Sequence, residues 1–170
     1  MRHKKDWGIG DTRSMTLWFD AMRAMGLDLL QVLPINEMPP GVSCPYTALS
    51  AFALDPIYIA VDELPELKES PALLEEVNSR RFQAGLRQLR GAKTVLYNEV
   101  RHLKFSTLWK VYTHFHQNHV LKDTALAAEF RAFCQANAGW LDDYAVFRRL
   151  KDTHNWTSWT HWENPLRARQ

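Results

Sequence analysis

Two neighbouring carboxylates, Asp142 and Asp143 in "WLDDY", are the side chains of this sequence that first suggest catalysis. A carboxylate pair can cleave a glycosidic bond when the two groups face each other across it, several ångströms apart. Adjacent residues on a helix instead point about 100° apart. We therefore interpret Asp142 and Asp143 as capping and first-turn charges, which stabilise the positive end of the helix dipole.

Three histidines in "THFHQNH", His114, His116 and His119, suggest a metal site. Ligands that share one ion on a helix lie three or four residues apart, and only His116 and His119 meet that condition. No cysteine or carboxylate stands nearby in the sequence to complete a tetrahedral set. A polar helix end is favoured over a metal site, and we expect no metal.

Three tryptophans, Trp156, Trp159 and Trp162, follow one another at intervals of three near the end of the sequence. They could stack on sugar rings or pack as one apolar face of a core, and the core is the more frequent role of such a face. Elsewhere, "GIGD" at residues 8–11 lacks the third glycine and preceding strand of a dinucleotide site. We interpret it as a turn before a helix.

Length and composition limit the class of protein. The 170 residues fall short of the roughly 250 of a complete (β/α)8 barrel, and 46% hydrophobic residues suit a packed globule. The net charge of +2 does not indicate a nucleic-acid partner. The two cysteines, Cys44 and Cys134, favour a reducing compartment, and no apolar run resembles a signal peptide or a membrane span, so we expect a cytoplasmic protein.

The first third has the pattern of an α/β fold. Asp11 is a candidate N-cap, and Gly26 a stop, for a helix whose apolar positions recur three and four residues apart. These positions are Met15, Trp18, Phe19, Met22 and Met25. The compact apolar run at residues 29–35 predicts a strand buried on both faces, as in a parallel sheet.

Residues 36–56 carry repeated prolines and no period, which predicts a long ordered loop, and residues 56–61 suggest another short strand. Beyond Pro65 the pattern becomes helical. Ser70 with Pro71 predicts a helix start, with a stop at Gly91. Further helices are predicted over about residues 94–118, after an Asp123 cap, and from Leu141. The natural domain boundary lies near Pro65.

Several segments together resemble the amino-terminal part of the 4-α-glucanotransferases, the amylomaltase or disproportionating-enzyme family (glycoside hydrolase family 77). They are "GIGD", "QVLPIN", "PYTALSAFALDP", "FCQANAGWLDDYAVFRRLKD" and "PLRAR", in the order of the family. The resemblance extends from about Trp7 to Arg169, and the set is more specific than any one segment.

The resemblance implies an α/β fold: part of a (β/α)8 TIM barrel, with its early helix and strand, carrying a mainly α-helical inserted subdomain. Residues 1–64 would form the barrel piece, and residues 65–170 the inserted subdomain. Ligands of such barrels meet the loops at the carboxyl ends of the strands. Loop 36–56, which directly follows the predicted strand, would then contact sugar.

Four residues are the substrate-binding candidates that the resemblance implies: Asn36, Cys44, Pro45 and Tyr46. Tyr46 would lie flat against a glucose ring, whose C–H face is weakly apolar. Cys44 stands where the family usually has serine, and Leu54 with Asp55 replaces the usual glycine and asparagine, which we interpret as a change in loop anchoring. Phe52 is expected to anchor the loop inside the protein.

The catalytic carboxylates of the family lie on later barrel strands, and none maps onto this sequence. We therefore expect an amino-terminal fragment that is inactive alone, from an enzyme that transfers α-1,4-glucan segments between maltodextrins by a retaining double displacement. The expected partner is a maltodextrin, without a cofactor, nucleic acid or membrane. The alternative is a non-enzymatic helical module that interacts with proteins or binds glucan.

Overall fold

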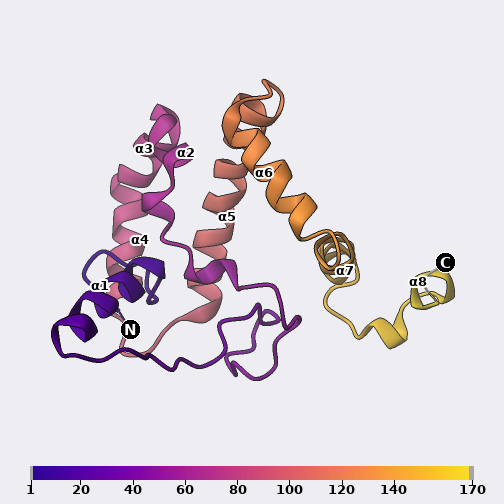
Figure 1. Cartoon of the computed structure of the whole chain (residues 1–170), viewed down its shortest axis with the longest axis horizontal. Helices are drawn as coiled ribbons and strands as arrows, with labels where there is room; N and C mark the ends of the chain where they lie inside the picture. The colour runs from indigo at the N-terminus through magenta and orange to yellow at the C-terminus, as the bar shows by residue number, and fades with distance from the viewer. Residues whose placement is uncertain (1, 169–170) are drawn as a thin grey trace. The chain divides into compact units, whose positions relative to one another are not determined.

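The computed structural model describes residues 2–168 and divides the chain into two compact units, Met1–Lys122 and Asp123–Gln170 (Figure 1). The first unit holds helices α1 to α5, and the second holds α6 to α8. None of the helices described is long and apolar enough to cross a membrane. The boundary predicted near Pro65 refers to the barrel of a longer protein and stays a prediction.

Helix α1 (Thr12–Ala24) begins and ends where the sequence predicts. The Asp11 carboxylate accepts a hydrogen bond from the Ser14 amide at 3.2 Å, and the Ser14 hydroxyl accepts one from the Asp11 amide at 3.2 Å, a reciprocal cap. Gly26 adopts a left-handed conformation with φ 71° just after the helix. The predicted apolar face is only partly buried, because Met22 is covered while Phe19 is 51% exposed.

The "GIGD" turn packs into the centre of the first unit. Gly8 has a φ of 92°, and a Cβ atom at this position would lie 2.8 Å from side-chain atoms of both Leu89 and Val100. The buried Asp6 carboxylate accepts a hydrogen bond from the Gly8 amide at 2.9 Å. The turn therefore requires glycine twice over, for its backbone conformation and for the close approach.

Four further helices form the rest of the first unit: α2 (Pro65–Glu69), α3 (Pro71–Asn78), α4 (Arg80–Gly91) and α5 (Tyr97–Phe115), the last continued by a π-helix (η3, His116–Val120). The predicted start at Ser70 and Pro71 is confirmed, since the Ser70 hydroxyl accepts from the Leu73 amide. Ser79 leaves the helical conformation and caps α4 through the Phe82 amide, so the predicted stripe is divided between two helices.

Two adjoining hydrophobic clusters make up the core of this unit. One contains Trp7, Val61, Leu67, Val77, Leu86 and Val111, and the other contains Ile9, Ile57, Leu89 and Val100. Each cluster combines the turn before α1 with side chains of the helices from residue 65 onward. The Trp7 indole meets the Phe82 ring edge-on, with centroids 5.2 Å apart.

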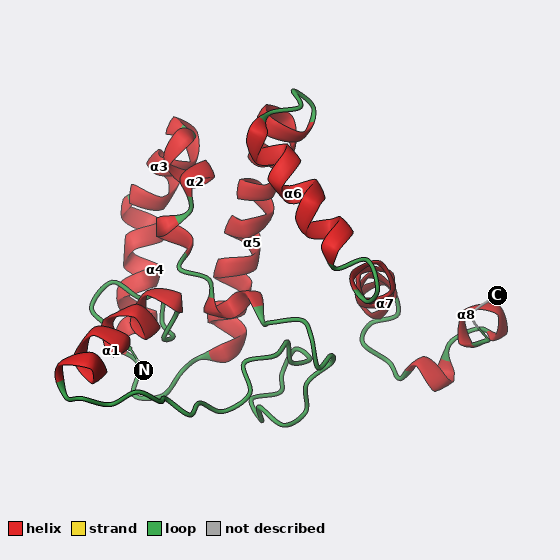
Figure 2. Cartoon of the chain, in the orientation of Figure 1, coloured by secondary structure: helices red, strands yellow, loops and turns green. Residues whose placement is uncertain are grey.

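The predicted strand at residues 29–35 is not formed in this structure, in which the described residues contain helices and loops but no strand (Figure 2). Leu29 is 82% exposed and Leu33 is 60% exposed, so the run is not buried on both faces. A parallel strand needs hydrogen-bonded neighbours on the sheet, and none is supplied by residues 2–168. Its apolar character nevertheless distinguishes this segment, residues 27–35, which we call the apolar segment.

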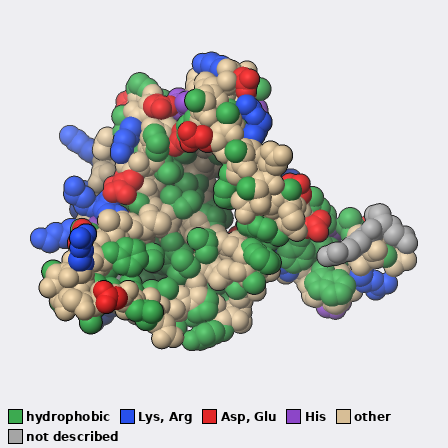
Figure 3. Space-filling model, in the orientation of Figure 1, with side chains coloured by type: hydrophobic (Ala, Val, Ile, Leu, Met, Phe, Trp, Pro, Cys, Tyr) green, Lys and Arg blue, Asp and Glu red, His purple; other side chains and the backbone are tan. Residues whose placement is uncertain are grey.

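Residues 56–61 also differ from the predicted strand. They begin with one 3-10 turn, η1 (Pro56–Tyr58), and lead into a second, η2 (Val61–Glu63). The Asp55 carboxylate accepts from the Ile57 amide and caps the first turn, which competes with an extended conformation. Figure 3 shows hydrophobic side chains on the viewed surface of the region that holds α1 and the loop after it.

The second unit consists of α6 (Ala125–Ala136), α7 (Leu141–Thr153), a 3-10 turn η4 (Trp159–His161) and the short α8 (Asn164–Arg167). Thr124, rather than the predicted Asp123, caps α6: it is extended and accepts from the Ala127 amide, whereas Asp123 is left-handed with φ 51°. Asp142 and Asp143 lie in the first turn of α7, as predicted.

Candidate functional site

Loop 36–56 is closed at its base by backbone hydrogen bonds. Asn36 and Leu54 form an isolated antiparallel bridge, and the Glu37 amide donates to the Ala53 carbonyl at 3.0 Å. The Asp55 amide donates to the Ile35 carbonyl at 2.9 Å on the other side of the bridge. The loop therefore leaves and re-enters the unit at one place, as compact surface loops do.

Asp55 fixes this base to α5. Its carboxylate is buried and accepts both terminal nitrogens of the Arg101 guanidinium, Nη1 at 3.2 Å and Nη2 at 2.6 Å. The same carboxylate accepts from the amides of Met38 at 3.3 Å and Ile57 at 3.0 Å. A paired carboxylate with four donors forms a strong anchor because the pairing compensates for its loss of water.

Lys104 holds the other side of the connection to α5. The fully buried ammonium donates to the carbonyls of Ile57 at 2.6 Å and Ile59 at 2.8 Å. Burial lowers the pKa of Lys104 to about 8, and nearby carboxylates, chiefly Asp11, oppose that shift. The pattern of the sequence did not reveal this role, because the two carbonyls are more than forty residues away.

Three of the four predicted substrate-binding residues lie together at the outer part of the loop. Tyr46 is 73% exposed, and Cys44 is exposed with a free thiol. The Cys44 carbonyl accepts from the Thr47 amide at 3.2 Å and the Thr47 hydroxyl at 2.8 Å, which makes a turn around Pro45 and Tyr46. The turn leaves the phenol ring of Tyr46 exposed on the outside of the loop.

Asn36 and Phe52 lie elsewhere in the loop. The Asn36 amide group donates to the Ala53 carbonyl at 3.4 Å, at the base of the loop. Phe52 was predicted to anchor the loop inside and does not, because its side chain is 66% exposed. The Ser50 hydroxyl accepts from the amides of both Phe52 and Ala53, and the resulting turn buries Ala53 instead.

A cavity of about 570 Å³ lies beside the loop. Its wall combines the start of α1, the apolar segment, both ends of the loop, and the rings of Tyr58 and Tyr97. Ser43 and the predicted site residue Pro45, from the middle of the loop, also line it. Asp11 also lines it, and one oxygen of that buried carboxylate, Oδ2, has no hydrogen-bond partner among the described residues. Burial raises the pKa of the Tyr58 phenol, which keeps this hydroxyl protonated as a donor. The cavity is thus apolar with a few polar groups, the usual composition of a ligand site.

The histidines form a different arrangement from the predicted one. Glu69 Oε2 lies 3.0 Å from Nε2 of His119 and 3.8 Å from Nε2 of His114. The wider π-helical turn after α5 accounts for a pair five residues apart. Within residues 2–168, no group of three histidine, cysteine, aspartate or glutamate side chains is arranged to hold a metal ion.

Comparison with known proteins decides the family of this chain. The family model described as 4-alpha-glucanotransferase matches residues 1–170. The chain belongs to the 4-alpha-glucanotransferase family. Family membership implies an enzyme of the TIM-barrel type, although the barrel itself is not formed by the described residues.

Individual members of the family are similar over most of this chain. A 4-alpha-glucanotransferase of Synechocystis sp. is 31% identical over 170 residues, covering 96% of the chain and 30% of the relative. That of Clostridium butyricum is 30% identical over 165 residues, covering 96% of the chain and 31% of the relative. That of Thermus thermophilus is 34% identical over 143 residues, covering 82% of the chain and 25% of the relative. The chain therefore spans less than a third of the length of these relatives.

Proposed function

We propose that this chain is the amino-terminal part of a 4-α-glucanotransferase, an enzyme that transfers α-1,4-glucan segments from one maltodextrin to another. The observation that carries the proposal is the family match over residues 1–170, together with relatives of that name that are about three times as long. We also propose a cytoplasmic location, because Cys44 and Cys134 are both free thiols, which favours a reducing compartment.

The proposal extends to the fold of the two parts of the chain. Residues 1–64 belong to a (β/α)8 barrel and residues 65–170 to its helical inserted subdomain. The exposed apolar segment supports this division, because Leu29 and Leu33 would be covered once neighbouring strands pair with it. Loop 36–56 would then stand at the carboxyl end of that strand, where barrels bind their ligands.

Tyr46 is the residue that contacts substrate in this proposal. Its exposed ring would lie against the C–H face of a glucose unit, with Cys44 and Pro45 at the edge and Asn36 at the base of the loop. The anchor from Asp55 to Arg101 supports this role, because a ring that stacks on sugar must be held by a loop of fixed position.

The reaction is a retaining double displacement. An aspartate attacks the anomeric carbon and forms a glucosyl-enzyme, while a glutamic acid protonates the departing oxygen. The glutamate then accepts a proton from the 4-hydroxyl of an acceptor glucan, which displaces the aspartate and restores the α-linkage. We place these carboxylates on later strands of the barrel, so residues 1–170 bind substrate without cleaving it.

Incubation with maltotriose tests the proposal. A protein that extends through the remaining barrel should release glucose and form longer maltodextrins, and the 170-residue chain should release none. In the extended protein, Tyr46→Ala should raise KM for maltotriose, whereas Tyr112→Ala, which removes a 46% exposed ring from α5, should not.

Two results would contradict the proposal. Turnover by the 170-residue chain would show that the catalytic groups lie within it. Binding of maltoheptaose by the extended protein without any transfer would favour the alternative, a glucan-binding module that is not an enzyme.

A further inference from the structure

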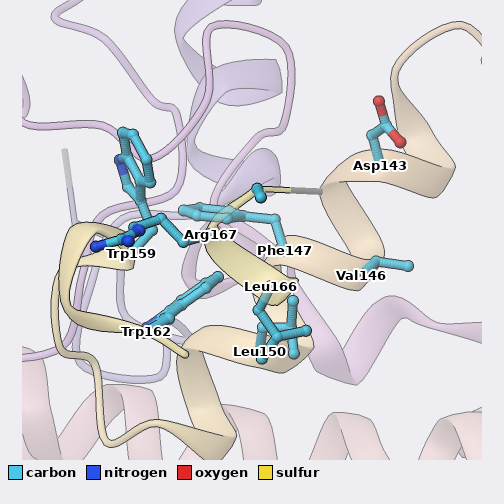
Figure 4. A pocket seen from close by; sticks show the side chains of 9 residues that line it. Asp143, Val146, Phe147, Leu150, Trp159, Trp162, Leu166 and Arg167 are labelled. Carbon is cyan, nitrogen blue, oxygen red and sulfur yellow. The ribbon is translucent and has the colours of Figure 1, made fainter. Parts of the chain in front are cut away.

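A second cavity, of about 610 Å³, lies within the unit formed by residues 123–170 (Figure 4). We call it the tryptophan pocket. Helix α7 contributes Asp143, Val146, Phe147 and Leu150, and the segment that follows it contributes Trp159, Trp162, Leu166, Arg167 and Ala168. Figure 4 shows Trp159 and Trp162 on that segment and Phe147 on α7.

Two of the three tryptophans at intervals of three line this pocket, and they do so in different ways. Trp162 is 7% exposed and packs between Phe147, at 5.8 Å between ring centroids, and His154, at 5.1 Å. Trp159 is 50% exposed, so a large part of its ring is open to a ligand. Trp162 thus forms a fixed wall, and Trp159 an accessible aromatic surface.

Trp156 does not belong to the pocket. The Arg148 guanidinium lies 4.4 Å from its ring, and the Lys151 ammonium lies 5.6 Å away. Trp156 has a left-handed backbone with φ 61°, which turns the chain after α7. The three tryptophans therefore form neither a single face of a core nor a row of three aromatic rings that could stack on sugars.

The polar groups of the pocket indicate the chemistry of its ligand. Nε1 of Trp162 is buried and has no hydrogen-bond partner among residues 2–168, so it is not accessible to a ligand and Trp162 serves as an apolar wall. Asp143 and Arg167, both exposed, add an acceptor and several donors. A fitting ligand carries oxygen atoms beside an apolar face, as a pyranose ring does.

We propose that the tryptophan pocket is a binding site for α-linked glucose units, formed by Trp159 and Trp162 together with Asp143 and Arg167. The glucan as ligand rests on the proposed function, and the pocket itself rests on the geometry of these side chains. A glucose ring stacks on the exposed face of Trp159 and lies beside the fixed wall that Trp162 forms. Asp143 and Arg167 bind the remaining hydroxyl groups.

The test uses the complete 170-residue chain labelled with ¹⁵N and titrated with maltoheptaose. The chain has seven tryptophans, so seven indole N–H signals can be followed and assigned by single substitutions to phenylalanine. The signals of Trp159 and Trp162 should shift, and Trp159→Ala should weaken binding about tenfold. The matched control, Trp109→Ala, removes a 69% exposed indole from α5 and should change the affinity less than about twofold.

Three outcomes would overturn the proposed site. They are an indole signal of Trp162 that does not move with maltoheptaose, an affinity unchanged by Trp159→Ala, and an equal shift with the β-linked cellohexaose. Loss of the Trp162 shift in Tyr46→Ala would also overturn it, because the pocket contains no residue of the loop.

The two proposals fail separately. If the indole signal of Trp162 does not shift with maltoheptaose but the extended protein transfers glucose units from maltotriose, the proposed binding site is rejected and the proposed function is retained. A clear Trp162 shift in a chain whose extended form transfers nothing would retain the pocket and reject the enzyme.

Discussion

Helix α5 and the stretch formed by the apolar segment and loop 36–56 belong to the same compact unit but are held in different ways. Val100 and Lys104 of α5 are fully buried, and the helix contributes to both hydrophobic clusters. Leu29, Leu33 and Tyr46 of the other stretch are all at least 60% exposed. That stretch is connected to the core chiefly through its base, at Asp55 and Met38.

The contrast follows from where each element finds its hydrogen bonds. An α-helix satisfies its backbone within four residues, so α5 forms wherever its apolar stripe meets a partner. A parallel strand satisfies its backbone only on neighbouring strands, which are far away in sequence. A helical part can therefore form within residues 2–168 while a segment that was predicted to be a strand stays an exposed, apolar loop.

Removal of the Asp55 carboxylate is expected to have the largest effect, because it joins the two regions. Asp55→Ala leaves the Arg101 guanidinium without its partner in a mostly buried place, which should lower the free energy of unfolding by about 3–5 kcal/mol. Urea unfolding followed by circular dichroism measures the loss. Asp55→Asn keeps the size of the side chain and should lose less. A loss below about 1 kcal/mol in Asp55→Ala would show that the base of the loop is held by its backbone bonds alone.

Substitution of Gly8 should come next. Gly8→Ala adds a Cβ atom 2.8 Å from side-chain atoms of Leu89 and Val100 and also strains a φ of 92°, so we expect a loss of about 2–4 kcal/mol. Gly26→Ala is the matched control, because Gly26 also has a positive φ, 71°, but no atom lies within 4 Å of an added Cβ. It should lower the free energy of unfolding by about 1 kcal/mol. An equal loss of unfolding free energy in the two variants would contradict the close packing of Gly8. It would mean that Leu89 of α4 and Val100 of α5 move away from the added Cβ at little cost in free energy.

The sequence predicts those parts of the fold whose causes are local. The Asp11 cap, the Gly26 stop and the start at Ser70 and Pro71 each depend on a few adjacent residues, and all three were correct. The break at Ser79 was missed, because Leu74, Val77 and Leu86 fit one continuous stripe as well as two.

Other features depend on partners far away in the sequence and could not be predicted. Arg101 and Lys104 look like ordinary exposed charges of a helix until Asp55, Ile57 and Ile59 are placed beside them. Glu69 likewise meets His119 only through folding. For the candidate site, the role of Tyr46 stays a prediction, and the inward orientation expected for Phe52 was wrong.

Substitution of Lys104 should have a smaller effect on the free energy of unfolding. Measured as a function of pH, it tests the contact between the two regions. Lys104→Met leaves the Ile57 and Ile59 carbonyls without their donor and should cost about 2 kcal/mol at pH 7. The folded pKa, about 8, lies below the ordinary value of 10.5, so the unfolded chain binds more protons between these values. The stability of the wild type relative to Lys104→Met should therefore rise from pH 8 to pH 10.5 and stay constant below pH 8. A difference that falls over this interval would contradict the assigned direction of the pKa.

The smallest effect should come from the apolar segment itself. Leu29→Ser changes an 82% exposed side chain and should alter the free energy of unfolding by less than about 0.5 kcal/mol. Leu67→Ser changes a side chain that is 2% exposed in the same unit, and it should cost more than about 3 kcal/mol. In a protein extended through the barrel, the cost of Leu29→Ser should rise toward that of Leu67→Ser. A cost that stays near zero there would argue against a buried strand at this position.

The closed base of loop 36–56 has an evolutionary consequence. Because the Asn36 and Leu54 bridge keeps the two ends together, residues at the exposed tip around Tyr46 can be inserted, removed or exchanged without pulling on the helices. Under the role proposed for Tyr46, selection on ligand preference can then act at the tip while the anchor at Asp55 is left unchanged. Transplanting the tip from another member of the family should accordingly be a practical way to change specificity without redesigning the scaffold.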